Sequence, residues 1–267
     1  MMRSLKIAGV LACGVSAFCG VAWSADASRV FDKPLREQHL PLPSDPLNPQ
    51  VKATLSCFYY PSLMVKQVDM GEKGAEQLSM ISIQKGQKPP ACRRENADGE
   101  SVVGDWNGYF LGVRQGYVFF SGDDSTAGGE PFAVYDGAGS AKIFHDVADP
   151  LQSVEPMLPP RDPALRPWYH RPLVLKYRKV YVAPCSMRSD GARCWGLIKQ
   201  ATGVAQTSAP DCDSAYAVAE KNAPQDQLDG LRRDPSVITY SVEAVIDDQG
   251  AARVTPTSSV HQCYPAP

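Results

Sequence analysis

Residues 105–146, DWNGYFLGVRQGYVFFSGDDSTAGGEPFAVYDGAGSAKIFHD, decide the fold class. Four short apolar runs in this stretch are rich in aromatic and β-branched residues: Tyr109–Val113, Tyr117–Phe120, Phe132–Tyr135 and Lys142–Phe144. Glycine-containing turns separate the runs at a spacing near ten residues. Short strands at this spacing, joined by turn residues, are typical of an antiparallel meander. The stretch therefore predicts a mainly β protein built from antiparallel sheets.

The rest of the chain extends this pattern in both directions. Further strands are expected at 53–60, 63–68, 77–83, 173–183, 193–198, 237–246 and 252–255. One short helix is expected at 214–221, where good helix formers follow a capping aspartate, Asp211 or Asp213, and end before Pro224. The predicted fold is an irregular sandwich or two small β lobes with one short helix, stabilised by disulfides.

Two proline-rich segments suggest the domain limits. Residues 26–50 form an extended N-terminal segment, and residues 149–172 form a crossover of about 24 residues, which is long for a loop within one compact domain. The expected organisation is a leader at 1–25, the extended segment, a β-rich lobe at 51–148, the crossover, and a β-rich lobe with the helix at 173–267.

The N-terminus has the layout of a secretory signal peptide. Arg3 and Lys6 precede an uncharged run from Ile7 to Ala22, and small residues surround the expected cleavage point near Ala25. The apolar run is short for a bilayer span, so an uncleaved anchor is the less favoured alternative. We expect cleavage after residue 25 and a mature protein in the periplasm or outside the cell.

The cysteine count agrees with export. Six cysteines follow the leader, and an even number in an oxidising compartment predicts three disulfides. Cys185 and Cys194 are paired by locality, because Asp190-Gly191 between two apolar runs is a hairpin signal. Order and elimination then give Cys57–Cys92 and Cys212–Cys263. There is no Cys-x-x-Cys spacing of the kind that binds zinc.

The net charge and the hydropathy of the chain limit the classes of partner that it is expected to bind. The chain has a net charge of −2, and removal of the leader with its two cations leaves −4. This mild acidity argues against nucleic acid, which requires a basic surface. Beyond the leader no stretch reaches the roughly 18 apolar residues of a spanning helix, so no membrane span is expected in the mature chain.

The sequence has no recognisable catalytic motif. Gly-x-Ser-x-Gly, His-Glu-x-x-His and a glycine-rich phosphate loop are all missing, and no cofactor is predicted. His145 and Asp146 could act as a base and its orienting acid, but adjacent strand residues point to opposite faces. A weak calcium hypothesis rests on Asp123, Asp124 and Glu130, and the alternative is that they lie in a solvated turn. Whether the chain is an enzyme stays open, with binding favoured.

The cluster Trp168, Tyr169, His170 and Arg171 is the candidate for ligand recognition. Aromatic residues beside an arginine are typical of interface hot spots, and flanking prolines lower their ordering entropy. Stacking on carbohydrate is a second role, and coverage of the core is the structural alternative. Trp106 and Trp195 are expected in the core.

These features predict an exported, non-enzymatic β-scaffold protein that binds another exported protein, for example as an inhibitor or an immunity-type partner. The alternative is a protein that binds or cleaves envelope glycans, using the aromatic cluster and carboxylates such as Asp123, Asp124 and Asp146. Cleavage would require two carboxylates at a suitable separation. A purely structural envelope component is the third possibility.

Overall fold

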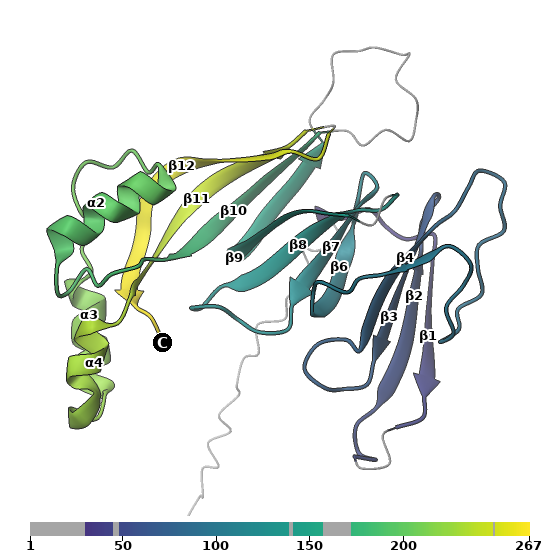
Figure 1. The fold of residues 1–267 in the computed structure, drawn as a ribbon, viewed down its shortest axis with the longest axis horizontal. Helices are drawn as coiled ribbons and strands as arrows, with labels where there is room; N and C mark the ends of the chain where they lie inside the picture. The colour runs from purple at the N-terminus through teal and green to yellow at the C-terminus, as the bar shows by residue number, and fades with distance from the viewer. Residues whose placement is uncertain (1–29, 45–47, 139–140, 157–171, 248) are drawn as a thin grey trace, which may run out of the picture.

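A computed structural model describes residues 30–44, 48–138, 141–156, 172–247 and 249–267. Its strands form two sheets, one of five strands in the order β1-β2-β3-β4-β5 and one of seven in the order β12-β11-β10-β9-β8-β7-β6 (Figure 1). Every pair of neighbouring strands is antiparallel. The prediction of a mainly β, antiparallel protein is confirmed.

The five-stranded sheet packs against one end of the seven-stranded sheet as a sandwich. Its strands are β1 (Arg36–Leu42), β2 (Ala53–Tyr59), β3 (Leu63–Asp69), β4 (Gln77–Ser82) and β5 (Glu100–Val102). The facing strands are β6 (Gly108–Arg114), β7 (Tyr117–Gly122) and β8 (Glu130–Asp136). Val65 and Met80 from the first sheet share a buried cluster with Val118 and Phe120 from the second. This cluster is the core of the sandwich.

The outer face of the five-stranded sheet carries a second apolar cluster. Leu55, Tyr59, Met64 and Ile81 are buried there, and Cys92 packs against them from the connection between β4 and β5. This connection therefore covers the sheet as a third layer.

The seven-stranded sheet continues beyond the sandwich through four long strands. These are β9 (Lys142–Pro156), β10 (Leu173–Val182), β11 (Ser236–Ile246) and β12 (Ala252–Pro265). The largest core cluster extends from Phe119 and Phe132 through Tyr177 to Trp195 and Tyr216 in the helical region. The predicted hairpin near the C-terminus is present as β11 and β12.

The expected crossover at 149–172 needs correction over its first part. Residues 149–156 belong to β9, which pairs with both β8 and β10, so strands from both predicted lobes share one sheet. Pro150 lies where the β9–β10 register shifts, and a bulge is a position that a strand proline can occupy. Residues 157–171 lie outside the described part of the chain.

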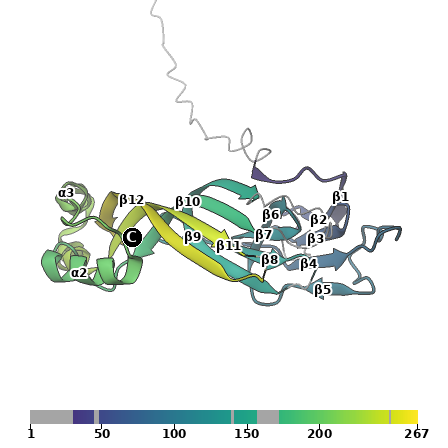
Figure 2. The ribbon, with the colours of Figure 1, turned by 90° about the horizontal axis from the view of Figure 1, so that it is seen from above.

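Helices α2 (Gly191–Thr202), α3 (Asp213–Asn222) and α4 (Leu228–Arg233), with the short η2 (Gln225–Gln227), gather at one end of the molecule. The five-stranded sheet lies at the opposite end of the long axis (Figures 1 and 2). Helix α3 confirms the helix predicted at 214–221, but the expectation of a single helix is wrong.

The strand predicted at 193–198 is part of α2. The Asp190 carbonyl accepts a hydrogen bond from the Cys194 N–H at 2.9 Å and begins the helix, so Asp190-Gly191 is a helix start and not a hairpin turn. Cys194, Trp195 and Ile198 are the buried residues of α2 and form one helical face. Gly203, with φ of 72°, ends α2 in the left-handed conformation.

The three predicted disulfides are all present, namely Cys57–Cys92, Cys185–Cys194 and Cys212–Cys263. Each one ties a segment outside the sheets to a strand or to the exit of a strand. The pairing of Cys185 with Cys194 is right although the hairpin that suggested it is wrong, because the turn at residues 187–189 and the first turn of α2 also bring the two sulfurs together.

None of the helices in the described ranges is long and apolar enough to cross a lipid bilayer.

Candidate functional site

The recognition cluster predicted from the sequence, Trp168 to Arg171, lies outside the described residues. Trp195 is in the core as expected, at 4% exposure. Trp106 is half-buried at the edge of the sandwich core, and its indole N–H donates to the Ser121 carbonyl at 2.9 Å. These two tryptophans are therefore accounted for by packing.

The loop proposed for calcium has other contacts. Asp124 forms an ion pair with Lys73, and Glu130 is exposed at the start of β8. In the described ranges, no group of three or more His, Cys, Asp or Glu residues is arranged to hold a metal ion. The loop instead reaches β12, where the Ala127 carbonyl accepts a hydrogen bond from the Tyr264 hydroxyl at 2.9 Å.

Asp146 is one of the carboxylates that the glycan hypothesis would use, and both of its oxygens already accept hydrogen bonds. The Lys179 ammonium donates to its two oxygens at 2.7 and 2.6 Å, and the Tyr177 hydroxyl also donates to it. Burial and then the Asp146 charge raise the pKa of Tyr177 well above its usual value. His145, next along β9, is exposed, so the two side chains do not form a catalytic pair.

A hollow of about 680 Å³ lies where the β3–β4 loop meets the exit of β1 and the segment before β5. Its lining mixes Met70 with charged side chains from both loops: Glu72, Lys73, Glu76 and Arg94. Arg94 contacts Glu76 at 3.0 Å, and both side chains are about half exposed. The hollow therefore offers both signs of charge around an apolar patch.

A buried ion pair holds the segment that carries Arg94. The Lys66 ammonium lies 2.6 Å from a Glu100 oxygen, with side-chain exposures of 1% and 0%. The same ammonium donates to the backbone carbonyls of Arg94 at 3.3 Å and Glu95 at 3.2 Å. A buried ion pair is tolerated only when its remaining hydrogen-bonding capacity is satisfied, and here the backbone of the segment satisfies it.

Glu100 is satisfied in the same way. One oxygen accepts the Ser79 hydroxyl at 2.5 Å, and the other accepts the Ala97 N–H at 2.7 Å. Burial opposes ionisation of this carboxyl, but the donors from Lys66, Ser79 and Ala97 outweigh burial and hold the pKa of Glu100 below its usual value. Glu100 is therefore a carboxylate at neutral pH.

The Cys57–Cys92 disulfide lies next to this ion pair. Lys66 lies directly opposite Cys57 on one side and Ser79 on the other in the strand register. Cys57 is fully buried and is bonded to Cys92, two residues before Arg94. One patch of the sheet thus fixes residues 92–100 both covalently and electrostatically, and we call these residues the latched segment.

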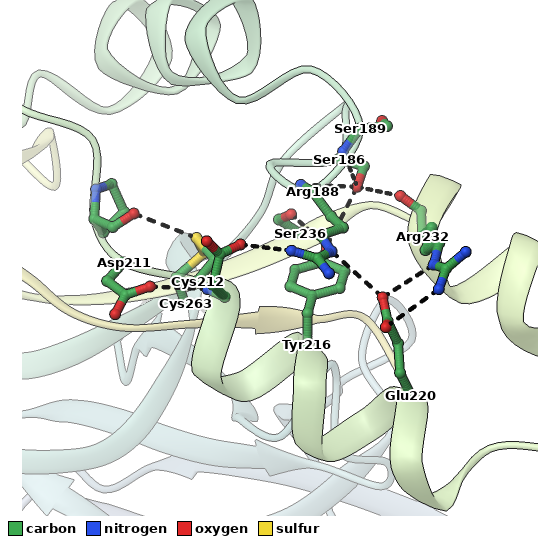
Figure 3. A network of polar contacts seen from close by, with 12 residues as sticks. Ser186, Arg188, Ser189, Asp211, Cys212, Tyr216, Glu220, Arg232, Ser236 and Cys263 are labelled. Atoms are coloured by element: carbon green, nitrogen blue, oxygen red, sulfur yellow. Dashed lines mark hydrogen bonds and ion pairs between the residues drawn. A yellow bond between two sulfur atoms is a disulfide. The ribbon is translucent and has the colours of Figure 1, made fainter.

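A second polar network joins the helices to the sheet (Figure 3). The Ser186 hydroxyl donates to the Arg232 carbonyl at 2.6 Å, and Tyr216 and Ser236 exchange a hydrogen bond of 2.7 Å. Towards solvent, Glu220 contacts Arg188 at 3.3 Å and Arg232 at 3.0 Å. Arg232 and then Arg188 lower the pKa of Glu220 below its usual value. The contacts link α3, α4 and the entry to β11, which is a structural role.

A third polar group lies on the face of the long strands opposite the core. Arg178 and Ser241 are directly paired between β10 and β11. His261 Nε2 on β12 lies 2.9 Å from the Ser241 hydroxyl and 3.0 Å from the Ser258 hydroxyl. The sequence contains no sign of this group, because Arg178 and His261 are more than 80 residues apart and come together only through the pairing of β10, β11 and β12.

Comparisons with protein-family models, with curated proteins and with solved structures give no match.

Proposed function

We propose that this chain is an exported, non-enzymatic binding protein that recognises another exported protein through the hollow beside Arg94. The observation that carries the proposal is the latched segment, a surface loop immobilised by a disulfide and by a buried ion pair at the edge of that hollow.

Such immobilisation favours binding. Association is opposed by the entropy of ordering loops and side chains, and a loop that is already fixed in the free protein avoids much of this cost. A buried ion pair gives little net stability compared with apolar residues of the same size. Its use under this loop is therefore better explained by a need for defined geometry than by a need for stability.

The chemistry of the hollow suits a protein partner. Arginine is among the residues enriched at interface hot spots, and Arg94 lines the same hollow as the apolar side chain of Met70. Two carboxylates and two cations line the hollow, so a partner with complementary charges would be oriented as well as attracted. An inhibitor or immunity-type role would be one form of this recognition.

Export is supported by the three disulfides, since such bonds persist in the periplasm and outside the cell and are rare in the cytosol. The leader-like residues 1–25 lie outside the described part of the chain. The glycan alternative receives no comparable support. Trp168 and Tyr169 also lie outside the described residues, and Asp146 and Asp124 are engaged by lysines.

Capture from a native envelope extract tests the proposal. Oxidised protein comprising residues 26–267 is immobilised as wild type, as Arg94→Glu and as the control Arg93→Glu. Arg93 is exposed and does not line the hollow, so the control makes the same charge change one residue away. We expect one defined exported protein to bind the wild type and the control and to be lost with Arg94→Glu. Equal retention by all three, or no retention above a blank resin, would contradict the proposal.

A further inference from the structure

Two irregularities of the seven-stranded sheet meet at the pair formed by Arg178 and Ser241. The β9–β10 register shifts on either side of Tyr177, which leaves Arg178 with no residue directly opposite on β9. The β11–β12 register shifts on either side of Tyr240, which leaves Ser241 with no residue directly opposite on β12. Bulges re-aim side chains and are frequent beside functional sites. Here one bulge lies on each side of a single directly opposed pair.

The bulge in β12 brings two polar side chains to this pair. The Ser258 hydroxyl oxygen accepts the Ser241 backbone N–H at 2.9 Å, in place of a ladder hydrogen bond. His261 lies on the same side and contacts both serine hydroxyls. Arg178, Ser241, Ser258 and His261 therefore form a polar row across three strands.

The position of the protons follows from counting donors. A serine hydroxyl has one proton to give, and that of Ser258 goes to the Ser259 carbonyl at 2.8 Å. When the Ser258 proton goes to that carbonyl, the contact between Ser258 and His261 is donated by the histidine, in the tautomer that carries a hydrogen on Nε2. In that tautomer Nε2 does not accept the Ser241 proton. Within the described residues that proton contacts no acceptor, so Ser241 remains a donor.

Arg178 adds further unused donors. In the described part of the chain its guanidinium has a single partner, Asp149, at 3.5 Å from Nη1, and the side chain is 33% exposed. Its Nε is buried with no hydrogen-bond partner. The row thus presents an excess of hydrogen-bond donors around one fixed positive charge, and Asp149 is the anionic neighbour with which a ligand would compete.

We propose that Arg178 and Ser241, positioned by His261 and Ser258, form a binding site for the oxyanion of a small ligand, a carboxylate or a phosphate. Guanidinium groups bind such planar or tetrahedral oxyanions through parallel N–H donors, and a hydroxyl adds a further donor. The site lies on β10–β12 and the hollow is lined by loops around the five-stranded sheet, so this proposal is independent of the proposed protein partner.

The test is a titration of the oxidised, ¹⁵N-labelled protein with sodium phosphate and, separately, with sodium acetate, at fixed pH and with sodium chloride at matched ionic strength as reference. Amide shifts of Ser241, Ser258 and His261 report binding. The variants are Arg178→Gln, Ser241→Ala and the control Lys176→Gln, which lies on the same strand and face and contacts Glu155 at 3.7 Å.

We expect saturable shifts with at least one of the two anions. Arg178→Gln should abolish them, Ser241→Ala should weaken binding about tenfold through loss of one hydrogen bond, and Lys176→Gln should bind like the wild type. Saturation by phosphate alone identifies a phosphate site, and saturation by acetate identifies a carboxylate site. Linear shifts with both anions, or equal saturation in folded Ser241→Ala and Arg178→Gln variants, would overturn the proposal.

Discussion

The two ends of the molecule hold their non-sheet segments in different ways. At the end with the five-stranded sheet, the latched segment is fixed by one disulfide and by the fully buried Lys66–Glu100 pair. At the helical end, two disulfides fix the helices, and the charged contacts around Glu220 lie towards solvent.

The difference shows where charge contributes to structure. A buried charge that loses its partner is left unsolvated, whereas an exposed charge regains water, so only the first kind makes its surroundings depend on it. The five-stranded end should therefore be sensitive to single charge deletions, and the helical end should be sensitive to loss of its disulfides.

The largest effect is expected for Lys66→Ala. Removal of the ammonium leaves the Glu100 carboxylate buried without its partner and should lower the free energy of unfolding by about 3–5 kcal/mol. Urea unfolding followed by fluorescence measures this. The control is the double variant Lys66→Met with Glu100→Leu, which should recover most of the loss because it removes both charges. A double variant as unstable as the single one would show that the charge pairing is not the cause.

The next largest losses of stability are expected when a disulfide is removed, and the loss should be greater for the disulfide that closes the longer loop. In the chain-entropy model, Cys212–Cys263 with a separation of 51 contributes about 4 kcal/mol, and Cys185–Cys194 with a separation of 9 contributes about 3 kcal/mol. Paired Cys→Ala variants compared by thermal unfolding give the ranking. A greater loss for the shorter loop would mean that local geometry, and not chain entropy, dominates at the helical end.

Acidification should weaken the end with the five-stranded sheet through Glu100. Because the pKa of Glu100 is lower in the folded protein than in the unfolded chain, the unfolded chain binds more protons as the pH falls. The contribution of Glu100 to stability is thus complete above its ordinary pKa of about 4.5 and is lost as the pH falls through the folded value. Between pH 7 and pH 3 the free energy of unfolding of wild type should therefore fall relative to that of the double variant, which has no Glu100 to protonate. A constant difference would contradict this assignment.

The smallest effect is expected for Glu220→Gln at the helical end. Its partners Arg188 and Arg232 are partly exposed and can be hydrated, so the ion pairs are screened by solvent. Thermal unfolding of this variant should match wild type within measurement error, in both low and high salt. A marked loss that salt abolishes would show that the exposed network carries more stability than the comparison allows.

Local patterns explain which parts of the fold the sequence could reveal. Apolar runs of strand length with glycine turns predicted β6–β9, and the cysteine order predicted all three bonds. The hairpin predicted at Asp190-Gly191 is wrong because the same two residues suit both a tight turn and the start of a helix. The decisive signal was the helical spacing of Cys194, Trp195 and Ile198.

The candidate site was less predictable, because its parts meet only through strand pairing. The one local sign of the buried pair is Lys66, which follows the apolar residues Leu63–Val65 and faces the same side as Met64. Its partner Glu100 follows 34 residues later, and no periodicity links them. The bulges that unite Arg178 with His261 likewise depend on register, which spacing along the chain does not fix.

Hydrogen exchange at the Ala97 amide tests most directly whether the latched segment is rigid in the free protein. This N–H donates to the Glu100 carboxylate at 2.7 Å, in a surface loop where amides ordinarily exchange fast. In oxidised protein without any partner, exchange should be at least about a hundredfold slower than in an unstructured peptide, as for an opening that costs about 3 kcal/mol. Exchange at the peptide rate would mean that the loop is not held before binding, and the account of the hollow as a preformed recognition site would be wrong.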